Sequence, residues 1–302
     1  MIDITNLTKS YGEHTALSDV SFRTEKSSIC GIIGPNGAGK TTFLRLCAGI
    51  LKPDSGVVKM NGEPVFDNPA AKQTLFYLPD EVYYPFSATI NGLARFYKGY
   101  YPRFNTEWFR RMLKLFGLNP KKRMLGLSKG MKRQALISLA VAANPDYLLM
   151  DESFDGIDPV KRGIVKDLLL EYMAESGCCI LISSHNLGEI SALSDRVVML
   201  GQKRVKFDCE LGELGDHYLK IQAVFENVVP AMFAEDENIL NAEINGRMLS
   251  GVLRGDIDEL TAKLEKAGAE DIKSSRLSLE EIFILESQAE KGGTYDVSEI
   301  FK

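Results

Sequence analysis

Residues 34–42 read GPNGAGKTT, and this stretch decides the fold. It follows an apolar run at 27–34, SSICGIIG, and opens the helix-forming stretch TTFLRLCAGI. A strand, a glycine-rich turn and a helix in this order, with the pattern G-x-x-x-x-G-K-[ST], are typical of a phosphate-binding loop. The glycines let successive backbone N–H groups face one anion, and the helix N-terminus adds its dipole. We therefore predict a nucleotide-binding α/β fold rather than a glycine-rich turn that binds nothing.

The side chains of this loop have separate expected roles. Lys40 reaches the β- and γ-phosphates of ATP, Thr41 holds Mg²⁺, and Thr42 assists at the α-phosphate. ATP and Mg²⁺ are thus the predicted ligands. The predicted ATP-binding residues of the loop are Gly34, Pro35, Asn36, Gly37, Ala38, Gly39, Lys40, Thr41 and Thr42.

Two acids end another apolar run, DYLLMDE at 146–152. Asp151 suits the coordination shell of Mg²⁺, directly or through water. Glu152 is placed to deprotonate or orient the attacking water. Acids at such a position also cap helices. Together with the phosphate loop, however, the pair indicates a site for ATP hydrolysis.

The order of apolar and helical runs gives the domain organisation. Short β-branched runs alternate with helical stretches in the first 210 residues, which is typical of a parallel sheet covered by helices. We predict a P-loop NTPase core over 1–210 with a helical subdomain inserted at about 80–145. A small α+β domain is expected at 211–287 and a flexible polar tail at 288–302. Expected strands are 27–34, 146–152, 178–185, 196–201, 220–226, 239–245 and 248–255, with helices at 256–268 and 278–287.

The bulk composition is that of an ordinary globular protein. Hydrophobic residues make up 45% of the 302, charged residues make up 25%, and the net charge is −5. This balance argues against nucleic acid as a partner. No apolar run approaches the roughly 20 residues of a membrane span, and the first residues lack the pattern of a secretion signal. Five scattered cysteines, without metal-binding spacing, are expected to be buried, reduced thiols of a cytosolic protein.

These motifs, in this order, resemble the nucleotide-binding subunits of ABC transporters over about 210 residues. GPNGAGKTT then corresponds to the Walker A loop and YLLMDE to the Walker B strand. The resemblance implies that Tyr11 stacks on adenine, that Asp158 contacts a second subunit, and that His185 senses the γ-phosphate. Each residue also has a simpler reading: surface packing for Tyr11, a turn or the start of a helix for Asp158, and a satisfied core histidine for His185. We expect Asp158 to start a helix as well as to contact the second subunit.

LSKGM at 127–131 stands where the family has its LSGGQ signature, which grips the γ-phosphate bound to the other subunit. Ser128 and Gly130 are retained and are the expected ATP-binding residues. Lys129 and Met131 replace a glycine and the glutamine. If Lys129 has a negative φ, its backbone serves as glycine's does, and its side chain adds positive charge. The alternative is a loop without grip, in which Ser128 only caps the following helix.

Two further positions depart from the family pattern. YLPDEVYYP puts Asp80 where the family often has a glutamine that links the sheet to the helical subdomain. A carboxylate can coordinate Mg²⁺ or bind water, but it cannot donate a hydrogen bond as an amide can. We expect Asp80 to be a metal ligand, with its role open. Ser153 replaces the usual proline after Glu152, and no catalytic group is lost.

The resemblance implies an ATP-hydrolysing motor at the cytoplasmic face of a membrane. It would dimerise around two ATP, with a second copy or a paralogous ATPase, and drive separate transmembrane permease subunits. The aromatic stretch at 83–109 suggests a groove for a permease helix, although most of its rings are expected in the subdomain core. SLEEIFILES at 278–287 favours the branch that exports peptides, drugs or lipids. An importer motor, a soluble ABC ATPase and a small-molecule P-loop kinase are the alternatives.

Overall fold

The computed structural model describes residues 1–81 and 83–291 and divides into two compact units. The first is Met1–Asp208, and the second runs from Cys209 onward. The division falls two residues before the predicted boundary at 210.

A six-stranded sheet forms the centre of the first unit, with strand order β10-β9-β3-β8-β7-β6. Neighbouring strands from β9 to β6 are parallel. All residues of β3, β7 and β8 are buried, as expected for parallel strands covered on both faces. The strands are β3 (Ile29–Ile33), β6 (Leu75–Leu78), β7 (Tyr147–Asp151), β8 (Cys179–Ser183), β9 (Arg196–Gly201) and β10 (Arg204–Glu210).

A second sheet in this unit, with the order β2-β1-β4-β5, is antiparallel. Its strands are β1 (Ile2–Tyr11), β2 (His14–Thr24), β4 (Ser55–Met60) and β5 (Glu63–Pro64). We did not predict this sheet. Register shifts between β1 and its neighbours, and positive φ angles at Asn6 and Asp19, break the alternation that reveals strands.

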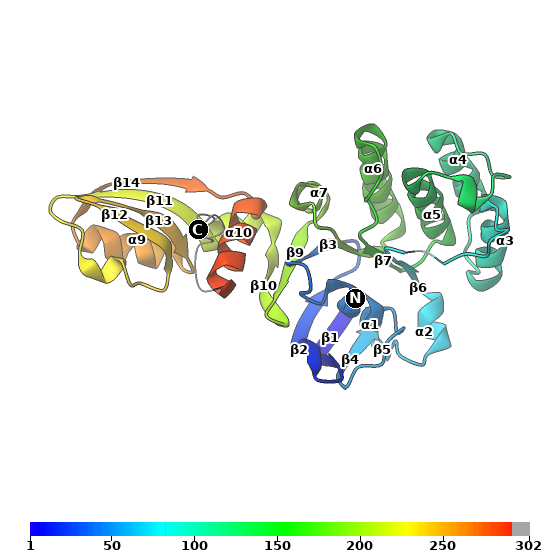
Figure 1. The fold of residues 1–302 in the computed structure, drawn as a ribbon, viewed down its shortest axis with the longest axis horizontal. Coiled ribbons are helices and arrows are strands. Elements are labelled where there is room, and N and C mark those ends of the chain that lie inside the picture. The colour runs from blue at the N-terminus through cyan, green and yellow to red at the C-terminus, as the bar shows by residue number, and fades with distance from the viewer. Residues whose placement is uncertain (82, 292–302) are drawn as a thin grey trace, which may run out of the picture. The chain divides into compact units, whose positions relative to one another are not determined.

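Helix α1 (Lys40–Cys47) contacts strands of both sheets, and its Phe43, Leu44, Leu46 and Cys47 belong to one buried cluster with them. Figure 1 shows α5 (Lys129–Ala143), α6 (Pro159–Ser176) and α7 (Leu187–Leu193) on one side of the parallel sheet and the antiparallel sheet on the other. The phosphate loop between β3 and α1 is therefore anchored in the main core. The remaining helices outside the inserted subdomain are α2 (Pro69–Gln73), α6 (Pro159–Ser176) and α7 (Leu187–Leu193).

The predicted helical subdomain contains α3 (Ile90–Tyr100), α4 (Thr106–Phe116) and α5 (Lys129–Ala143), with a 3₁₀ turn at Met124–Gly126. Both α3 and α4 pack on α5, which is almost entirely buried. The expectation that most rings of 83–109 fill the core holds only in part, because four of them are half-buried: Tyr84, Tyr97, Tyr101 and Trp108. Only Phe104 and Phe109 are fully buried, and four rings are exposed: Tyr83, Phe86, Phe96 and Tyr100.

The second unit is an antiparallel sheet with helices. The strand order is β12-β13-β11-β14, and one face packs on α9 (Ile257–Lys266) around Phe225, Phe233 and Leu249. β14 was not predicted, because six of its eight residues are exposed and it carries little hydrophobic signal. The strands are β11 (Tyr218–Phe225), β12 (Ile239–Asn245), β13 (Met248–Arg254) and β14 (Ala269–Arg276); α8 (Leu214–His217) and 3₁₀ turns at Leu211–Glu213 and Ala231–Phe233 complete the unit with α10.

The predicted tail divides at the end of α10 (Leu279–Lys291). Residues 288–291 continue this helix, and 292–302 lie outside the described residues. Among the residues that the structure describes, no helix is long and apolar enough to cross a membrane. Four cysteines are buried as expected, and burial raises the pKa of the Cys47 thiol. Cys209 is only half-buried, which corrects the expectation for that residue.

Candidate functional site

The loop at 34–42 folds tightly between β3 and α1. Gly34 and Gly39 have φ angles of 155° and 98°, a region that favours glycine. A Cβ on Gly34 would lie 2.4 Å from the carbonyl oxygen of Leu200, and one on Gly39 would lie 2.7 Å from Cδ2 of Leu17. Larger residues are therefore excluded at both positions, and the backbone is free to curl at the start of α1.

Lys40 is the first residue of α1, and its side chain turns back over the loop. Its Nζ donates hydrogen bonds to the carbonyl oxygens of Gly34 at 2.7 Å and Pro35 at 3.3 Å. Burial lowers the pKa of Lys40, while the nearby charges of Glu152 and Asp151 act in the opposite direction. The ammonium therefore lies within the electrostatic reach of both acids.

Asp151 ends β7 and is 1% exposed. Its Oδ1 accepts hydrogen bonds from Ser183 Oγ at 2.7 Å and Thr41 Oγ1 at 3.3 Å, and its Oδ2 accepts one from the Tyr77 hydroxyl at 3.3 Å. Burial, reinforced by the charge of Asp151, raises the pKa of Tyr77 to about 12. A buried carboxylate surrounded by neutral hydroxyl groups fits a site for a divalent cation, which would supply the missing positive charge.

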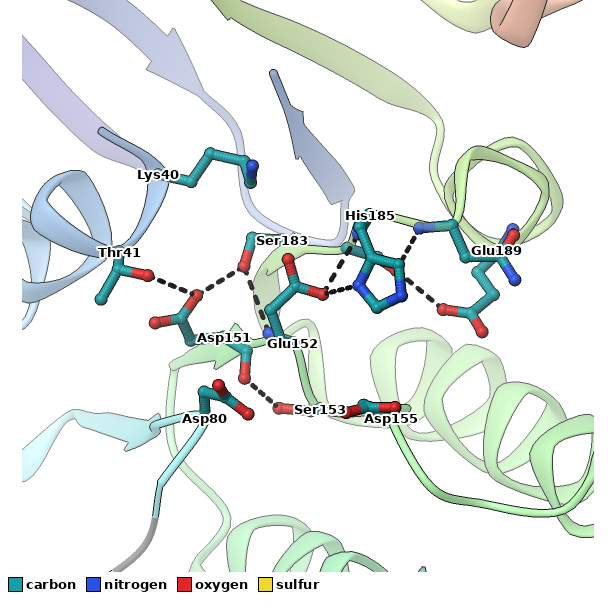
Figure 2. A network of polar contacts seen from close by, with 12 residues as sticks. Lys40, Thr41, Asp80, Asp151, Glu152, Ser153, Asp155, Ser183, His185 and Glu189 are labelled. Carbon is teal, nitrogen blue, oxygen red and sulfur yellow. Dashed lines mark hydrogen bonds and ion pairs between the residues drawn. The ribbon is translucent and has the colours of Figure 1, made fainter. Parts of the chain in front are cut away.

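Glu152 follows directly and adopts a left-handed backbone conformation, with φ 46°. Non-glycine residues rarely adopt this conformation, and such strain often marks functional sites. The backbone N–H of Glu152 donates to the carbonyl oxygen of Ser183 at 3.1 Å, which holds the residue against the end of β8. The turn directs its carboxylate away from that of Asp151 and toward His185 (Figure 2).

His185 lies just after β8 and contacts Glu152 twice. Oε2 of Glu152 accepts from the backbone N–H of His185 at 3.1 Å and lies 2.7 Å from its Nδ1. An ionised carboxylate only accepts hydrogen bonds, so Nδ1 carries the proton in this contact. In the neutral ring Nε2 is then an acceptor. The side chain of His185 is 65% exposed, so it is not the buried core histidine of the simpler reading.

The signature-like stretch begins α5, and Ser128 is its N-cap. Its Oγ accepts from the backbone N–H of Met131 at 3.3 Å. Lys129 is the first residue of the helix and is absent from the residues with positive φ, so a glycine is not needed there. A Cβ on Gly130 would lie 2.4 Å from the carbonyl oxygen of Gly156, which excludes any side chain at that position.

Asp80 is held by an arginine of α5. Arg133, only 3% exposed, donates to the carboxylate of Asp80 at 2.6 Å and to the carbonyl oxygens of Pro79 and Asp80 at 2.7 and 2.5 Å. Its positive charge is thus matched by the acid that stands in place of the family's glutamine. The contact of Asp80 with a metal ion stays a prediction.

The predicted residues thus fall into two groups. Lys40, Thr41, Asp151, Glu152 and His185 gather around the ends of α1, β7 and β8 (Figure 2). Three others lie on the surface: Tyr11 is 47% exposed at the end of β1, Ser128 is exposed at the start of α5, and Asp158 caps α6 by accepting from the N–H of Lys161 at 3.0 Å. Gly130, in the first turn of α5, is buried. The expectation that Asp158 starts a helix is confirmed.

Four polar residues with direct contacts to this group were not predicted. Ser183 and Tyr77 bind Asp151, Arg133 binds Asp80, and Asp155 pairs with Lys129. Ser183 could have been found, because β8 and β7 are both apolar runs whose polar ends meet at one edge of a parallel sheet. Nothing in the sequence indicates the other three pairings.

A phosphate loop on a strand–helix unit, facing two acids and a histidine at the ends of adjacent parallel strands, defines a P-loop ATPase. Residues 17–155 match the family model for ABC transporters. The chain is 31% identical over 284 residues to the ABC transporter ATP-binding protein YtrB of Bacillus subtilis, spanning 94% of this chain and 97% of YtrB. The chain therefore belongs to the ATP-binding proteins of ABC transporters, and it is an ATPase.

Relatives with names for opposite directions of transport also match. The Fe(3+) ions import ATP-binding protein FbpC 2 of Pectobacterium atrosepticum is 29% identical, over 82% of this chain and 71% of its own length. The lipopolysaccharide export system ATP-binding protein LptB of Haemophilus influenzae is 31% identical, over 66% of this chain and 86% of its own length. A solved structure of an ATP-binding subunit of an ABC transporter aligns with a TM-score of 0.66 at 26% identity, over 71% of this chain and 91% of that one. The predicted α/β P-loop fold is confirmed.

Proposed function

We propose that this protein is the motor subunit of an ABC transporter, which closes as a dimer around two ATP and drives separate membrane permease subunits. The observation that carries the proposal is the array of Asp151, Glu152 and His185 beside the phosphate loop (Figure 2). The proposed location is peripheral, at the cytoplasmic face of the membrane. The partner ATPase is a second copy or a paralogue.

Within one subunit, the loop and acids divide the work on ATP. Lys40 and the loop N–H groups hold the β- and γ-phosphates, and Thr41 and Asp151 would hold Mg²⁺, which supplies positive charge to the phosphate oxygens. Glu152, the next residue after Asp151, orients or deprotonates the attacking water. His185, hydrogen-bonded to Glu152 through Nδ1, holds that carboxylate, and its Nε2 would donate to the γ-phosphate when the ring carries protons on both nitrogens.

The exposed residues supply the half of the site that acts across a dimer. The start of α5 presents backbone N–H groups beside Ser128, which caps the N–H of Met131, and the helix dipole favours an anion there. Asp158 lies at an exposed helix start. Tyr11 offers an exposed ring, with Lys9 Nζ 5.8 Å from its centre, on which an adenine can stack. Closure around ATP would bring such surfaces against a partner and shift the population toward the dimer.

The exposed aromatic rings of the helical subdomain are the proposed contact for the permease. The rings of Phe96 and Tyr100 on α3 lie in tilted contact, with centroids 4.9 Å apart, and more than half of each residue is exposed. Tyr83 is fully exposed and Phe86 is 82% exposed on the segment before it. Exposed apolar groups of this kind commonly mark docking sites for partner helices.

For the direction of transport, we propose export of a peptide, drug or lipid. The support is the resemblance of 278–287 to the closing helix of exporter ATPases, and the match to LptB agrees with it. The match to FbpC 2 keeps an importer motor as the second candidate. Reconstitution in vesicles with a candidate permease would separate the two, because ATP should move substrate in opposite directions.

Lys40→Ala tests the motor itself. The lysine bridges the loop carbonyls where the phosphates would lie, so its loss should lower Mg²⁺-dependent ATPase activity at least about 100-fold. Lys52→Ala, at an exposed position, is the matched control and should retain activity. Unchanged turnover in Lys40→Ala would remove the loop from the catalytic site.

A further inference from the structure

The lysine that departs from the family's signature is already engaged within its own chain. Nζ of Lys129 forms an ion pair with Oδ2 of Asp155, in the loop that follows Glu152. Both side chains are accessible, with 60% of Lys129 and 42% of Asp155 exposed. The contact with Lys129 lowers the pKa of Asp155, so the acid is ionised near neutral pH. The pair therefore lies at the surface, where a third charged group can reach it.

The two loops also touch through their backbones. A Cβ on Gly130 would lie 2.4 Å from the carbonyl oxygen of Gly156. A Cβ on Gly156 would in turn lie 3.0 Å from Cγ and Cδ of Lys129. The start of α5 and the loop after β7 are thus packed together at their glycines. The lysine stem lies along Gly156, and this contact aims its ammonium at Asp155.

Lys129 occupies an unfavourable position for a cation. It is the first residue of a 15-residue helix, where the exposed N–H groups and the dipole produce positive potential. A lysine at this point needs an anion close by. Asp155 supplies one from within the chain, and a phosphate group placed before Ser128 would supply a stronger one.

We propose that Asp155 stands in for the γ-phosphate, holding Lys129 until the ATP bound by a second copy of the chain takes its place. This inference rests on the proposed function, because it needs that ATP to face the start of α5. Dimer closure then exchanges one ion pair for another: Lys129 leaves the carboxylate of Asp155 and binds the phosphate. Asp155 is a competitor that sets how much ATP is needed for closure, and it takes no part in hydrolysis.

The test measures ATP-driven dimerisation in the Glu152→Gln background, in which turnover is slow. The observable is the ATP concentration that gives half-maximal dimer with Mg²⁺, followed by light scattering on a sizing column. Asp155→Asn removes the competitor and should lower this concentration by up to about fivefold, the range of exposed ion pairs. Lys129→Met should raise it. Adding Asp155→Asn to Lys129→Met should then change nothing, because the acid acts only through the lysine.

Two controls match the changes in charge. Asp167 is an exposed acid of α6, and Lys121 is an exposed lysine before α5. Neither Asp167→Asn nor Lys121→Met should change the ATP concentration that gives half-maximal dimer. High salt should shrink the effect of Asp155→Asn, since exposed pairs are screened.

Three results would overturn the inference. The first is that Asp155→Asn leaves unchanged or raises the ATP concentration for half-maximal dimer. The second is that Asp155→Asn has the same effect with and without Lys129, and the third is that Lys129→Met lowers this concentration. If Glu152→Gln alone forms no dimer with saturating ATP and Mg²⁺, the failure belongs to the proposed function.

Discussion

At the scale of single residues, the site rests on one turn of backbone. Asp151 and Glu152 are neighbours in sequence, yet their carboxylates contact different partners because Glu152 has a positive φ. Asp151 is buried among hydroxyl groups, and Glu152 is directed to His185. Two carboxylates with separate partners can carry separate roles, one at a cation and one at a water molecule.

His185→Ala tests the contact with Glu152. The substitution removes the ring held 2.7 Å from the carboxylate but leaves the phosphate loop intact. We expect kcat for ATP hydrolysis to fall about 100-fold or more, with KM for ATP changed only a few-fold. His217→Ala, an exposed histidine of the second unit, serves as the control in the same steady-state assay. An equal loss in both variants, or a rise in KM alone, would contradict this role.

Much of this residue-level picture could be predicted from the sequence. The phosphate loop, the acid pair and His185 each follow an apolar run, so their common edge of the sheet follows from topology. The partners of Lys129 and Asp80 could not be predicted. Each lies on a segment distant in sequence, and the sequence carries no signal for the packing of α5 that brings them together.

At the scale of elements, α5 links three parts of the first unit. Its Ser128 end begins the signature-like stretch, Lys129 reaches the loop after β7, and Arg133 reaches the segment after β6. The two charged residues among the departures from the family pattern are each neutralised by an opposite charge, Lys129 by Asp155 and Asp80 by Arg133. The departures therefore form a consistent set.

Arg133→Met probes this link. It leaves the carbonyl oxygens of Pro79 and Asp80 without their donor, and should lower the free energy of unfolding by about 1–3 kcal/mol. Asp80→Asn keeps an acceptor on an exposed side chain and should cost less than about 1 kcal/mol. Denaturant unfolding followed by fluorescence of Trp108, the single tryptophan of the chain, reports on this unit. A larger loss in Asp80→Asn would show that the acid, rather than the arginine, organises the segment.

Elements with one exposed face were the hardest to predict. Strands β3, β7, β8 and β9 are continuous apolar runs and were predicted within two residues, whereas β6 and β10 of the same sheet were not predicted. The antiparallel sheet and β14 were missed, because bulges, positive φ angles and polar edge residues break the two-residue period. Strand β6 is short, and its place beside β7 follows from the fold rather than from its own sequence.

At the scale of the whole molecule, two units with separate cores share one chain. The second unit contains an ion pair between Asp236 and Lys263, in which the acid's side chain is 8% exposed and Nζ lies 2.5 Å from Oδ2. The hydrogen bond from Lys263 lowers the pKa of Asp236. A folded pKa below the unfolded value of about 3.9 contributes stability above that value, and the contribution is lost as pH falls through the folded pKa.

Asp236→Asn should therefore destabilise the second unit near neutral pH and have no effect in acid. We expect a loss of up to about 1 kcal/mol at pH 7 that disappears well below pH 3.9. Calorimetry of the full chain at several pH values measures the difference. Asp258→Asn is the control, because Asp258 is an exposed acid of α9 and forms no ion pair within the part of this unit that the structure describes. A difference that grows as pH falls would have the wrong sign.

The central claim is that ATP closes two copies of this chain around the site built by Lys40, Asp151, Glu152 and His185. The most direct test is the mass of Glu152→Gln in solution, measured by light scattering with and without saturating ATP and Mg²⁺. Because hydrolysis is slowed while the phosphate loop is intact, we predict a monomer without nucleotide and a stable dimer with ATP. Adding Lys40→Ala to the same chain should abolish the dimer. A Glu152→Gln protein that stays monomeric at saturating ATP would contradict the account.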